Sequence, residues 1–258
     1  MSLLVTLTTD FEERDPFAAS MKGVLYSRCP GVQITDLSHD IPRQNVLEGA
    51  LFLAGAVPYF PKGTVHVVAV APGKRALAIS IDGQFVVCPD NGVITLLAKQ
   101  HAVNEAREIT NPELILSEAG RQKFFGRDVF APAAAFLAGG GALADVGPRV
   151  EQVALLNVPE PKREGTRSIS GIVIHVDRFG NVVTNIHRSS LEGAKVKNVE
   201  VGMVGVGPVV NSFSEVPAGN PLAIFGSADY LEVACNGGRA DTRLKLTPGL
   251  VANVTLEG

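Results

Sequence analysis

The chain has 258 residues, of which 46% are hydrophobic and 19% are charged, and its formal net charge at pH 7 is −3. A chain of this length can bury a sizeable core, and it fits one large domain or two smaller ones. The small negative charge gives no basic surface for a phosphate backbone, so we expect no nucleic-acid partner. No apolar run approaches the length of a membrane span, so we expect no membrane partner.

The N-terminus and the cysteines both favour a cytoplasmic location. The chain reaches Asp10 too soon for the apolar run and cleavage site of a signal peptide. Cys29, Cys88 and Cys235 are odd in number and far apart, so they suggest neither a disulfide framework nor a metal knuckle. We expect buried thiols in a reducing cytoplasm. The histidines show no paired zinc spacing, and we expect no metal site.

The first part of the chain alternates strand-like and helical segments, an order typical of parallel β-α-β units. Two further strands meet at Asp82-Gly83, a pair typical of a primed hairpin turn. We therefore expect an α/β domain over residues 1–156, with a mostly parallel sheet flanked by helices and an irregular edge. The predicted strands cover 3–9, 32–37, 64–70, 76–82 and 84–88, and the predicted helices cover 16–29, 44–59 and 128–140.

Residues 157–166 are polar, contain prolines and show no periodicity, which predicts a linker. After the linker, short β-rich runs alternate with glycines over residues 167–258. This pattern predicts a small all-β domain, either a barrel or a sandwich. The predicted strands of this domain cover 168–177, 180–186, 196–202, 221–226, 230–236 and 249–258.

Several acidic and amide residues have a structural interpretation beside a functional one. Asp10 ends the first predicted strand, at the carboxyl edge where open α/β sheets bind ligands. Asp15 precedes Pro16 and a helix, and by itself it is typical of a helix N-cap. Asp177 and Asn181 flank a glycine, and by themselves they are typical of a hairpin turn.

The remaining candidates are equally ambiguous when taken alone. Ser227, Glu232 and Asn236 lie on or around one predicted strand, where such residues serve either a ligand or a loop. For His39 and His66 the better interpretation is a structural histidine whose ring nitrogens are hydrogen-bonded. The sequence contains no phosphate loop, dinucleotide-binding glycine motif, serine-hydrolase elbow or HExxH helix.

Seven motifs are spread over nearly the whole chain, from about residue 4 to about residue 250, and both their sequences and their order along the chain are informative about the family. They are TTDFEERDPFAASMKGVL, DLSHDIP, FPKGTVHVV, PDNGV, FFGRDVFAPAAAFLA, HVDRFGNVVTNI and GSADYLEVACNGG. Together they resemble the S-adenosylmethionine (SAM) hydroxide adenosyltransferase family, whose relatives include fluorinating and chlorinating enzymes. The resemblance implies an N-terminal α/β domain, a C-terminal β-barrel and no cofactor beyond SAM itself. It also implies a homotrimer, with each SAM site between one subunit's first domain and its neighbour's second.

The resemblance also implies which residues bind the substrate. Asp10 would hold the ribose hydroxyls, a role that suits an ionised carboxylate because it is a pure acceptor with two oxygens. Asp15 and Asp177 would receive the methionine ammonium. The other implied contacts are Asn181 at the methionine end, Ser227 at the methionine carboxylate, Asn236 at the adenine edge and Phe179 packed against the ligand.

The positions that activate water in this family are changed in this sequence. The family's hydrolases use an Asp, an Arg and a His, but Ala71 stands at the Asp position and Phe125 at the His position. Lys74 or Arg75 would take the place of the arginine, in a loop that is about four residues shorter. A positioned base typically contributes ~10²–10⁴ to a rate, so its loss should be severe without abolishing turnover.

Three functions follow from these differences. The first is a SAM hydrolase that releases adenosine and L-methionine by in-line attack of water at the ribose 5′ carbon, and the resemblance favours it. The second is a SAM- or adenosine-binding protein without turnover, because Ala71 and Phe125 make the pocket apolar. The third is a transferase that uses a halide or another nucleophile, since a halide needs desolvation rather than a base. However, Ala71 and Gly126 replace the tyrosine and serine of the halogenating relatives.

Overall fold

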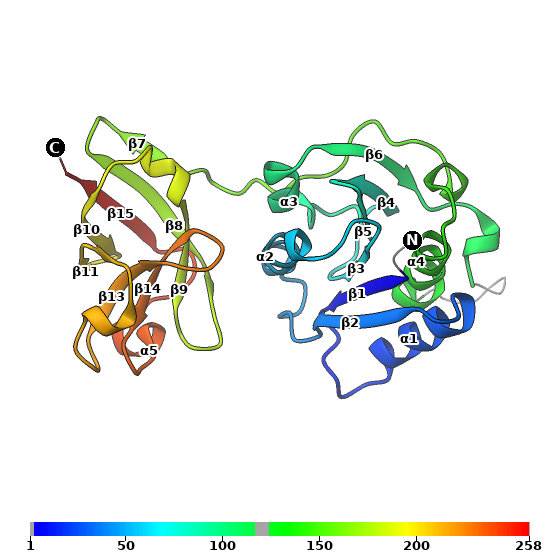
Figure 1. Cartoon of the computed structure of the whole chain (residues 1–258), viewed down its shortest axis with the longest axis horizontal. Helices are drawn as coiled ribbons and strands as arrows, with labels where there is room; N and C mark the ends of the chain where they lie inside the picture. The colour runs from blue at the N-terminus through cyan, green and yellow to red at the C-terminus, as the bar shows by residue number, and fades with distance from the viewer. Residues whose placement is uncertain (1–2, 117–123, 258) are drawn as a thin grey trace. The chain divides into compact units, whose positions relative to one another are not determined.

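A computed structural model of the chain describes residues 3–116 and 124–257. The chain forms two compact units, residues 1–156 and 157–258 (Figure 1). In the two described stretches, no helix combines the length and the apolar character needed to cross a membrane. Strand β7 (Lys162–Glu164) forms within the stretch predicted as a linker.

The first unit is built on a mixed sheet with the strand order β2-β1-β3-β5-β4-β6. Strand β1 is parallel to its neighbours, and β3 is parallel to β5, but β4 is antiparallel to both β5 and β6. The α/β class is therefore confirmed, while the sheet is mixed. The strands are β1 (Leu4–Thr9), β2 (Gln33–Ser38), β3 (Val65–Ala69), β4 (Ala76–Ile81), β5 (Gln84–Pro89) and β6 (Val103–Glu108).

The antiparallel part of the sheet has a local cause. Asp82 and Gly83, with φ of 47° and 70°, form the predicted tight turn and send β5 back along β4. No strand is predicted over β6, because its sequence VNEARE lacks an apolar run. Charged side chains are common on edge strands, where they discourage pairing with other chains.

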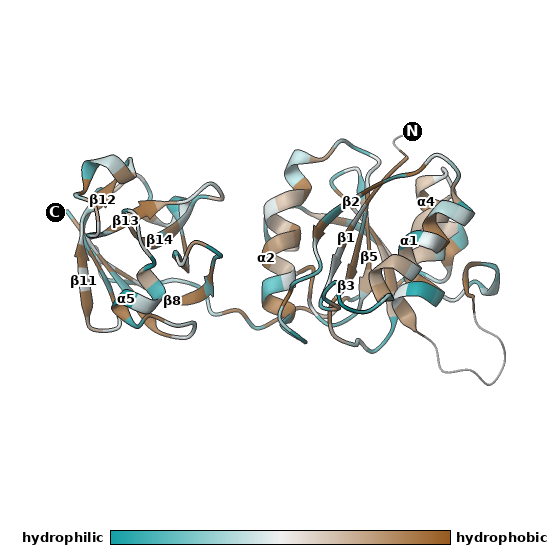
Figure 2. Cartoon of the chain, turned by 90° about the horizontal axis from the view of Figure 1, so that it is seen from below, coloured by the Kyte–Doolittle hydropathy of each residue, from teal (hydrophilic) through white to brown (hydrophobic). Residues whose placement is uncertain are grey.

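Helices cover both faces of this sheet (Figure 2). Helices α1 (Phe17–Arg28) and α4 (Ala131–Ala138) pack against each other on one face, and α2 (Val46–Ala56) covers the other. A π-helical turn, η3 (Gly126–Phe130), leads directly into α4. The other helical segments are α3 (Thr95–Gln100), η1 (Val57–Tyr59), η2 (Pro112–Leu114) and η4 (Leu143–Val146).

The core of the first unit lies between the sheet and helices α1 and α4. Every residue of β3 is buried, as expected for a central strand covered on both faces. Helix α4 is rich in buried alanines, and small side chains let its backbone come close to the sheet. The residues of the candidate site follow the ends of β1 and β3.

The second unit is a strongly curved sheet with the path β11-β10-β15-β8-β9-β14-β13-β12, and β7 pairs with β8. Strand β11 lies near β13, so the path nearly closes into a barrel. The strands are β8 (Ser168–Val176), β9 (Val182–His187), β10 (Val196–Val201), β11 (Val204–Gly207), β12 (Val209–Val210), β13 (Pro221–Phe225), β14 (Tyr230–Cys235) and β15 (Val251–Leu256).

This unit has its own apolar core, to which alternate residues of its strands contribute. Ile169, Val199, Val233 and Val254 are at most 1% exposed, whereas most of their neighbours along each strand are less buried. The barrel-like prediction is confirmed at this level. One short helix, α5 (Ala240–Leu244), and two 3₁₀ turns, η5 (Arg188–Leu191) and η6 (Phe213–Glu215), depart from a purely β structure.

Candidate functional site

A cavity of about 570 Å³ opens in the first unit, where β1 and β3 end. This volume and position are typical of small-molecule sites in α/β proteins. The wall comes from the segments that follow β1, β2 and β3, from the last residue of β5, and from η3 with the two residues before it. The lining residues are Asp10, Phe11, Glu12, Arg14, Asp15, Phe17, Arg43, Gln44, Ala69, Ala71, Pro72, Gly73, Arg75, Pro89, Phe124, Phe125, Gly126 and Phe130.

Asp10 is held at the cavity by two loops. Its Oδ2 accepts hydrogen bonds from the backbone N–H of Gln44, at 3.0 Å, and of Ala71, at 3.2 Å. Among the described residues, its Oδ1 has no hydrogen-bond partner. Asp10 therefore offers a fixed, half-buried carboxylate with one oxygen available to a ligand.

Asp15 lines the same cavity, and it is not a helix cap. The N-cap of α1 is Pro16, and no side chain donates or accepts a capping hydrogen bond there. The N-cap interpretation of Asp15 is therefore wrong, because the helix begins one residue later than a cap at Asp15 requires. The Asp15 carboxylate remains exposed at the cavity.

Ala71 and Phe125, where the family resemblance implies an Asp and a His, both line the cavity. Ala71 follows β3 and has a positive φ of 52°. Phe125 precedes η3, is 49% exposed, and packs its ring 6.1 Å from that of Phe130. The wall at both positions is apolar, and neither side chain can accept a proton.

Three more phenylalanines extend this apolar wall. The rings of Phe11, Phe17 and Phe124 lie 5.3–5.8 Å apart in tilted arrangements. Such spacing is favourable for aromatic pairs. Phe17 remains 45% exposed, so the cluster offers ring surface to the cavity. A ring face attracts a cation such as a sulfonium.

Arg75 lines the cavity, but its guanidinium is already engaged. Its Nε donates to Oδ2 of Asp90 at 2.9 Å, and its Nη2 donates to the Gln152 carbonyl at 2.8 Å. Asp90 is buried, and its other oxygen accepts from the N–H of Ala154 at 2.7 Å. Arg75 thus ties the segment before residue 157 to the cavity wall. Lys74 is exposed and outside the lining.

The sequence singles out only part of this cavity. Glu12, Arg14, Arg43 and Gln44 also line it, although no motif assigns them a role. The feature of the sequence that could have predicted them is their position in the two loops that follow β1 and β2. Within the described part of the chain, neither Arg14 nor Arg43 forms an ion pair, so both can face an anionic group of a ligand.

In the second unit, Asp177 and Asn181 close the turn between β8 and β9, as the hairpin prediction requires. The two oxygens of Asp177 accept hydrogen bonds from the backbone N–H and the side-chain amide of Asn181, at 2.8 and 2.9 Å. Gly180 has a φ of 84°, and a Cβ there would lie 2.6 Å from Oδ1 of Asp241. Phe179 stands at the tip and is 76% exposed.

Glu232 on β14 is electrostatically coupled to Asp177. Burial raises the pKa of Glu232 to about 7, with a further contribution from the charge of Asp177, and His175 opposes the shift. A Cβ on Gly226 would lie 1.8 Å from Oε1 of Glu232, so any larger residue there would require this carboxyl group to move. In the sequence, Glu232 is among the candidates around this strand, but no ligand contact is predicted for it.

Ser227 and Asn236 stand at opposite ends of β14. Ser227 is exposed before the strand, whereas Asn236 follows it and donates from Nδ2 to the Val216 carbonyl at 2.7 Å. A six-residue strand is about 20 Å long. Val233 pairs with Val182, so Asn236 lies at the end of β14 that is next to the 177–181 turn. Ser227 lies at the opposite end of β14.

The two histidines expected to be structural are both buried. The ring of His66 lies 2.8 Å from both the Thr6 hydroxyl and the Gln84 side chain, and burial lowers its pKa. The prediction is therefore confirmed for His66. His39 has one such partner, Thr9, at 2.9 Å.

The cysteines are expected to be structural, and a metal site is expected to be absent. Cys29, Cys88 and Cys235 are buried free thiols, as expected. Over residues 3–116 and 124–257, no group of His, Cys, Asp or Glu side chains has an arrangement that could hold a metal ion.

Comparison with known proteins gives the family. Residues 5–147 match the SAM hydroxide adenosyltransferase N-terminal domain, and residues 171–252 match the C-terminal domain. The chain is 38% identical to an (R)-S-adenosyl-L-methionine hydrolase of Salinispora arenicola, covering 97% of both chains. It is 39% identical to a protein of that name from Thermus thermophilus, covering 95% of this chain and 97% of the relative.

A solved structure agrees with this result. The crystal structure of an uncharacterized conserved protein from Thermotoga maritima is 33% identical, with a TM-score of 0.89, and the match covers 97% of this chain and 99% of that one. Both domains and the full-length relatives therefore agree, and the chain belongs to the SAM hydroxide adenosyltransferase family.

Proposed function

We propose that this protein hydrolyses SAM to adenosine and L-methionine. The observation that carries the proposal is Asp10, a carboxylate held by two backbone N–H groups at the cavity with one oxygen left for a ligand. Full-length relatives named (R)-S-adenosyl-L-methionine hydrolase support the same reaction.

The ligand contacts follow from the charges of SAM. Asp10 accepts hydrogen bonds from the vicinal ribose hydroxyls, and Asp15 with Asp177 receives the methionine ammonium. Ser227 contacts the methionine carboxylate, and Asn236 contacts the adenine edge. Asn181 supports the methionine end, and Phe179 packs against the ligand.

In the reaction, a water oxygen forms a bond to the ribose 5′ carbon while the bond from that carbon to sulfur breaks. The bonding electrons pass to sulfur, which leaves as the neutral thioether of methionine, and the water's extra proton passes to solvent. Alignment opposite a cationic leaving group supplies most of the rate. Arg75, which lines the cavity, orients the water more readily than Lys74, which does not.

A second function is a SAM- or adenosine-binding protein without turnover. The apolar wall at Ala71 and Phe125 supports this alternative, because no side chain at those two positions can take a proton from water. The same wall would also desolvate a halide, so halide-dependent release of methionine is a third outcome of the test.

We further propose a cytoplasmic homotrimer without metal, further cofactor or nucleic acid. The buried free thiols support a reducing compartment, and the net charge of −3 gives no basic surface. A trimer is supported by the fact that the expected substrate contacts are divided between the two units of the chain. The cavity is lined by the first unit, while Asp177, Asn181 and Asn236 belong to the second, so a neighbouring subunit can complete each site.

The test is chromatographic detection of adenosine and methionine after incubation with SAM, with and without chloride, beside an Asp10→Ala control. Adenosine that is absent in the control establishes hydrolysis at this cavity. Intact SAM that still binds by calorimetry establishes the binding protein, and chloride-dependent methionine release establishes the transferase.

A further inference from the structure

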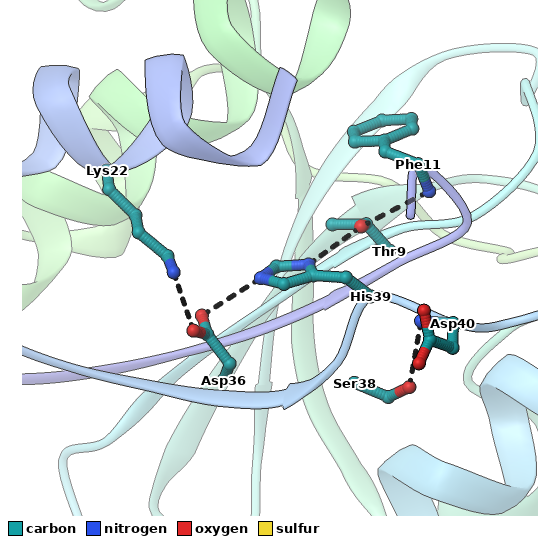
Figure 3. A network of polar contacts seen from close by, with 7 residues as sticks. All are labelled: Thr9, Phe11, Lys22, Asp36, Ser38, His39 and Asp40. Carbon is teal, nitrogen blue, oxygen red and sulfur yellow. Dashed lines mark hydrogen bonds and ion pairs between the residues drawn. The ribbon is translucent and has the colours of Figure 1, made fainter. Parts of the chain in front are cut away.

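A buried histidine that the proposed chemistry does not use contacts the strand end that carries Asp10 (Figure 3). The His39 side chain is 4% exposed, and its Nδ1 lies 2.9 Å from Oγ1 of Thr9, the residue before Asp10. Its Nε2 lies 3.1 Å from Oδ1 of Asp36 on β2, in a polar contact that is not aligned as a hydrogen bond.

The Thr9 hydroxyl has two polar partners. Its Oγ1 accepts from the Phe11 N–H at 3.4 Å and lies 2.9 Å from Nδ1 of His39. In the tautomer in which this hydroxyl donates to Nδ1, the ring proton is on Nε2 and faces Asp36. Lys22 on α1 donates to the other Asp36 oxygen, so the chain of contacts links α1, β2 and the end of β1 (Figure 3).

The backbone around His39 joins the end of β1 and the segment that follows it to the loop that holds Asp10 through Gln44. The His39 carbonyl accepts from the N–H of Glu12 at 2.8 Å, and the Ile41 N–H donates to the Thr9 carbonyl at 3.3 Å. The loop that begins at His39 continues to Gln44, whose N–H donates to Asp10. His39 therefore contacts the strand before Asp10 and stands at the start of the loop that holds the carboxylate.

We infer that His39 is a positioning residue, which fixes Thr9 and thereby the orientation of the Asp10 carboxylate toward the ribose hydroxyls. The inference rests on the proposed role of Asp10 as the ribose anchor. Binding constellations lose affinity with small displacements, and they depend on a supporting layer of hydrogen bonds. A buried imidazole with polar partners on two strands supplies such a support.

His66 provides a matched control. It is also buried, and it also contacts a β1 threonine, Thr6, through Nδ1. Thr6 lies four residues before Asp10 and outside the cavity lining. His39→Leu and His66→Leu therefore remove the same ring and the same kind of Thr contact, and only the first removes it beside Asp10. His39→Asn, which can keep a polar contact to Thr9, serves as the conservative variant.

The readout is ribose discrimination, the ratio of the dissociation constants of 2′-deoxyadenosine and adenosine, measured by calorimetry on the full chain. A hydrogen bond to a charged group contributes ~1.5–3 kcal/mol, so the wild-type ratio should be roughly 10–150. We expect His39→Leu to lower this ratio at least about fivefold, toward the value for Asp10→Ala, and His39→Asn to restore part of it. His66→Leu should lower the melting temperature and leave the ratio unchanged.

The outcomes separate this inference from the function on which it rests. A wild-type protein that binds both nucleosides equally would overturn the ribose role of Asp10, and the inference with it. A discriminating wild type, together with His39 variants that discriminate equally well, would overturn the inference alone. If His39→Leu does not fold, His39→Asn and Lys22→Met, at the outer end of the chain of contacts, take its place. A lowered ratio in these variants supports the inference, and a wild-type ratio in both overturns it.

Discussion

At the scale of single residues, Ala71 has a backbone conformation that some other residue types adopt more readily than alanine. Its φ of 52° lies in the left-handed region, which alanine adopts at a cost and which Asp and Asn tolerate better. The family resemblance places an aspartate at this position. The N–H of Ala71 donates to Asp10, so this loop supports the Asp10 carboxylate although position 71 itself carries no carboxylate.

Restoring the lost groups should raise turnover. We expect the double variant Ala71→Asp, Phe125→His to release adenosine from SAM faster by roughly 10²-fold, the lower range for a positioned base. Each single variant should gain less, because the two groups act on one water. The measurement is the initial rate of adenosine formation by liquid chromatography. Ala71→Asn is the matched control, since it fits the same backbone without a titratable group, and an equal gain in that control would contradict the argument.

Glu232 should make the stability of the protein depend on pH. Its pKa in the folded chain, about 7, lies above the value for an unfolded glutamate, so the folded form holds the proton more tightly. The resulting stabilisation is complete below the unfolded pKa and is lost as the pH rises through about 7. Glu232→Gln keeps the neutral shape at every pH.

We therefore expect Glu232→Gln to be more stable than the wild type at pH 8.5, by on the order of 1 kcal/mol after allowance for partial exposure. The difference should shrink toward zero near pH 4. Urea denaturation of the full chain at both pH values measures it. A difference that stays the same at both pH values would mean that packing, not ionisation, separates the two proteins.

At the scale of elements, the short loop between β3 and β4 depends on Gly73. A Cβ at this position would lie 2.7 Å from the backbone nitrogen of Asp90 and 2.8 Å from Cβ of Pro89, both at the end of β5. Neither contact can relax by turning a flexible side chain. The close approach of this loop to β5 places Ala71 beside Asp10 and Arg75 beside Asp90.

Gly73→Ala should consequently destabilise the protein by about 1–3 kcal/mol, as overpacking does, and weaken adenosine binding because the Ala71 N–H shifts away from Asp10. The control is Gly55→Ala, on the exposed side of α2, where a Cβ meets nothing within 4 Å. That change should stabilise the helix by roughly 0.5–1 kcal/mol. Urea denaturation and calorimetry give both quantities, and equal effects of the two changes would refute the steric argument.

At the scale of the whole molecule, the expected substrate contacts divide between two compact units. Asp10 and Asp15 belong to the first unit, and Asp177, Asn181 and Asn236 belong to the second. A closed ring of three subunits can pair each first unit with a neighbour's second unit. In the proposed trimer, activity would therefore be a property of the assembly.

Mixed assemblies test the proposal directly. Asp10→Ala and Asp177→Ala should each be inactive alone, but co-expression should recover about a quarter of the wild-type activity, because about one site in four would receive both intact residues in a randomly mixed ring. The measurement combines adenosine release with light scattering against the 27.1 kDa chain mass. Recovery should be absent if each chain completes its own site.

Local patterns were sufficient for most elements. Apolar runs and helical spacing predict β1, α1, α2 and β3 to within a few residues, and Asp82-Gly83 predicts the β4–β5 turn. They fail at β6, which is stabilised by pairing with β4 rather than by its own sequence. They fail also at Asp15, because the start of α1 depends on the conformation of Pro16.

The sequence by itself determined the family and the α/β and barrel-like classes, because these depend on local composition and on the order of motifs. The family resemblance also implies that Ala71 and Phe125 stand in place of an Asp and a His. Only the tertiary structure decided that Asp10 is fixed by Gln44 and Ala71, that Arg75 is engaged by Asp90, and that burial and Asp177 raise the pKa of Glu232. These facts depend on contacts between residues far apart in the chain, and a single sequence does not record the distances that set hydrogen bonds and pKa values.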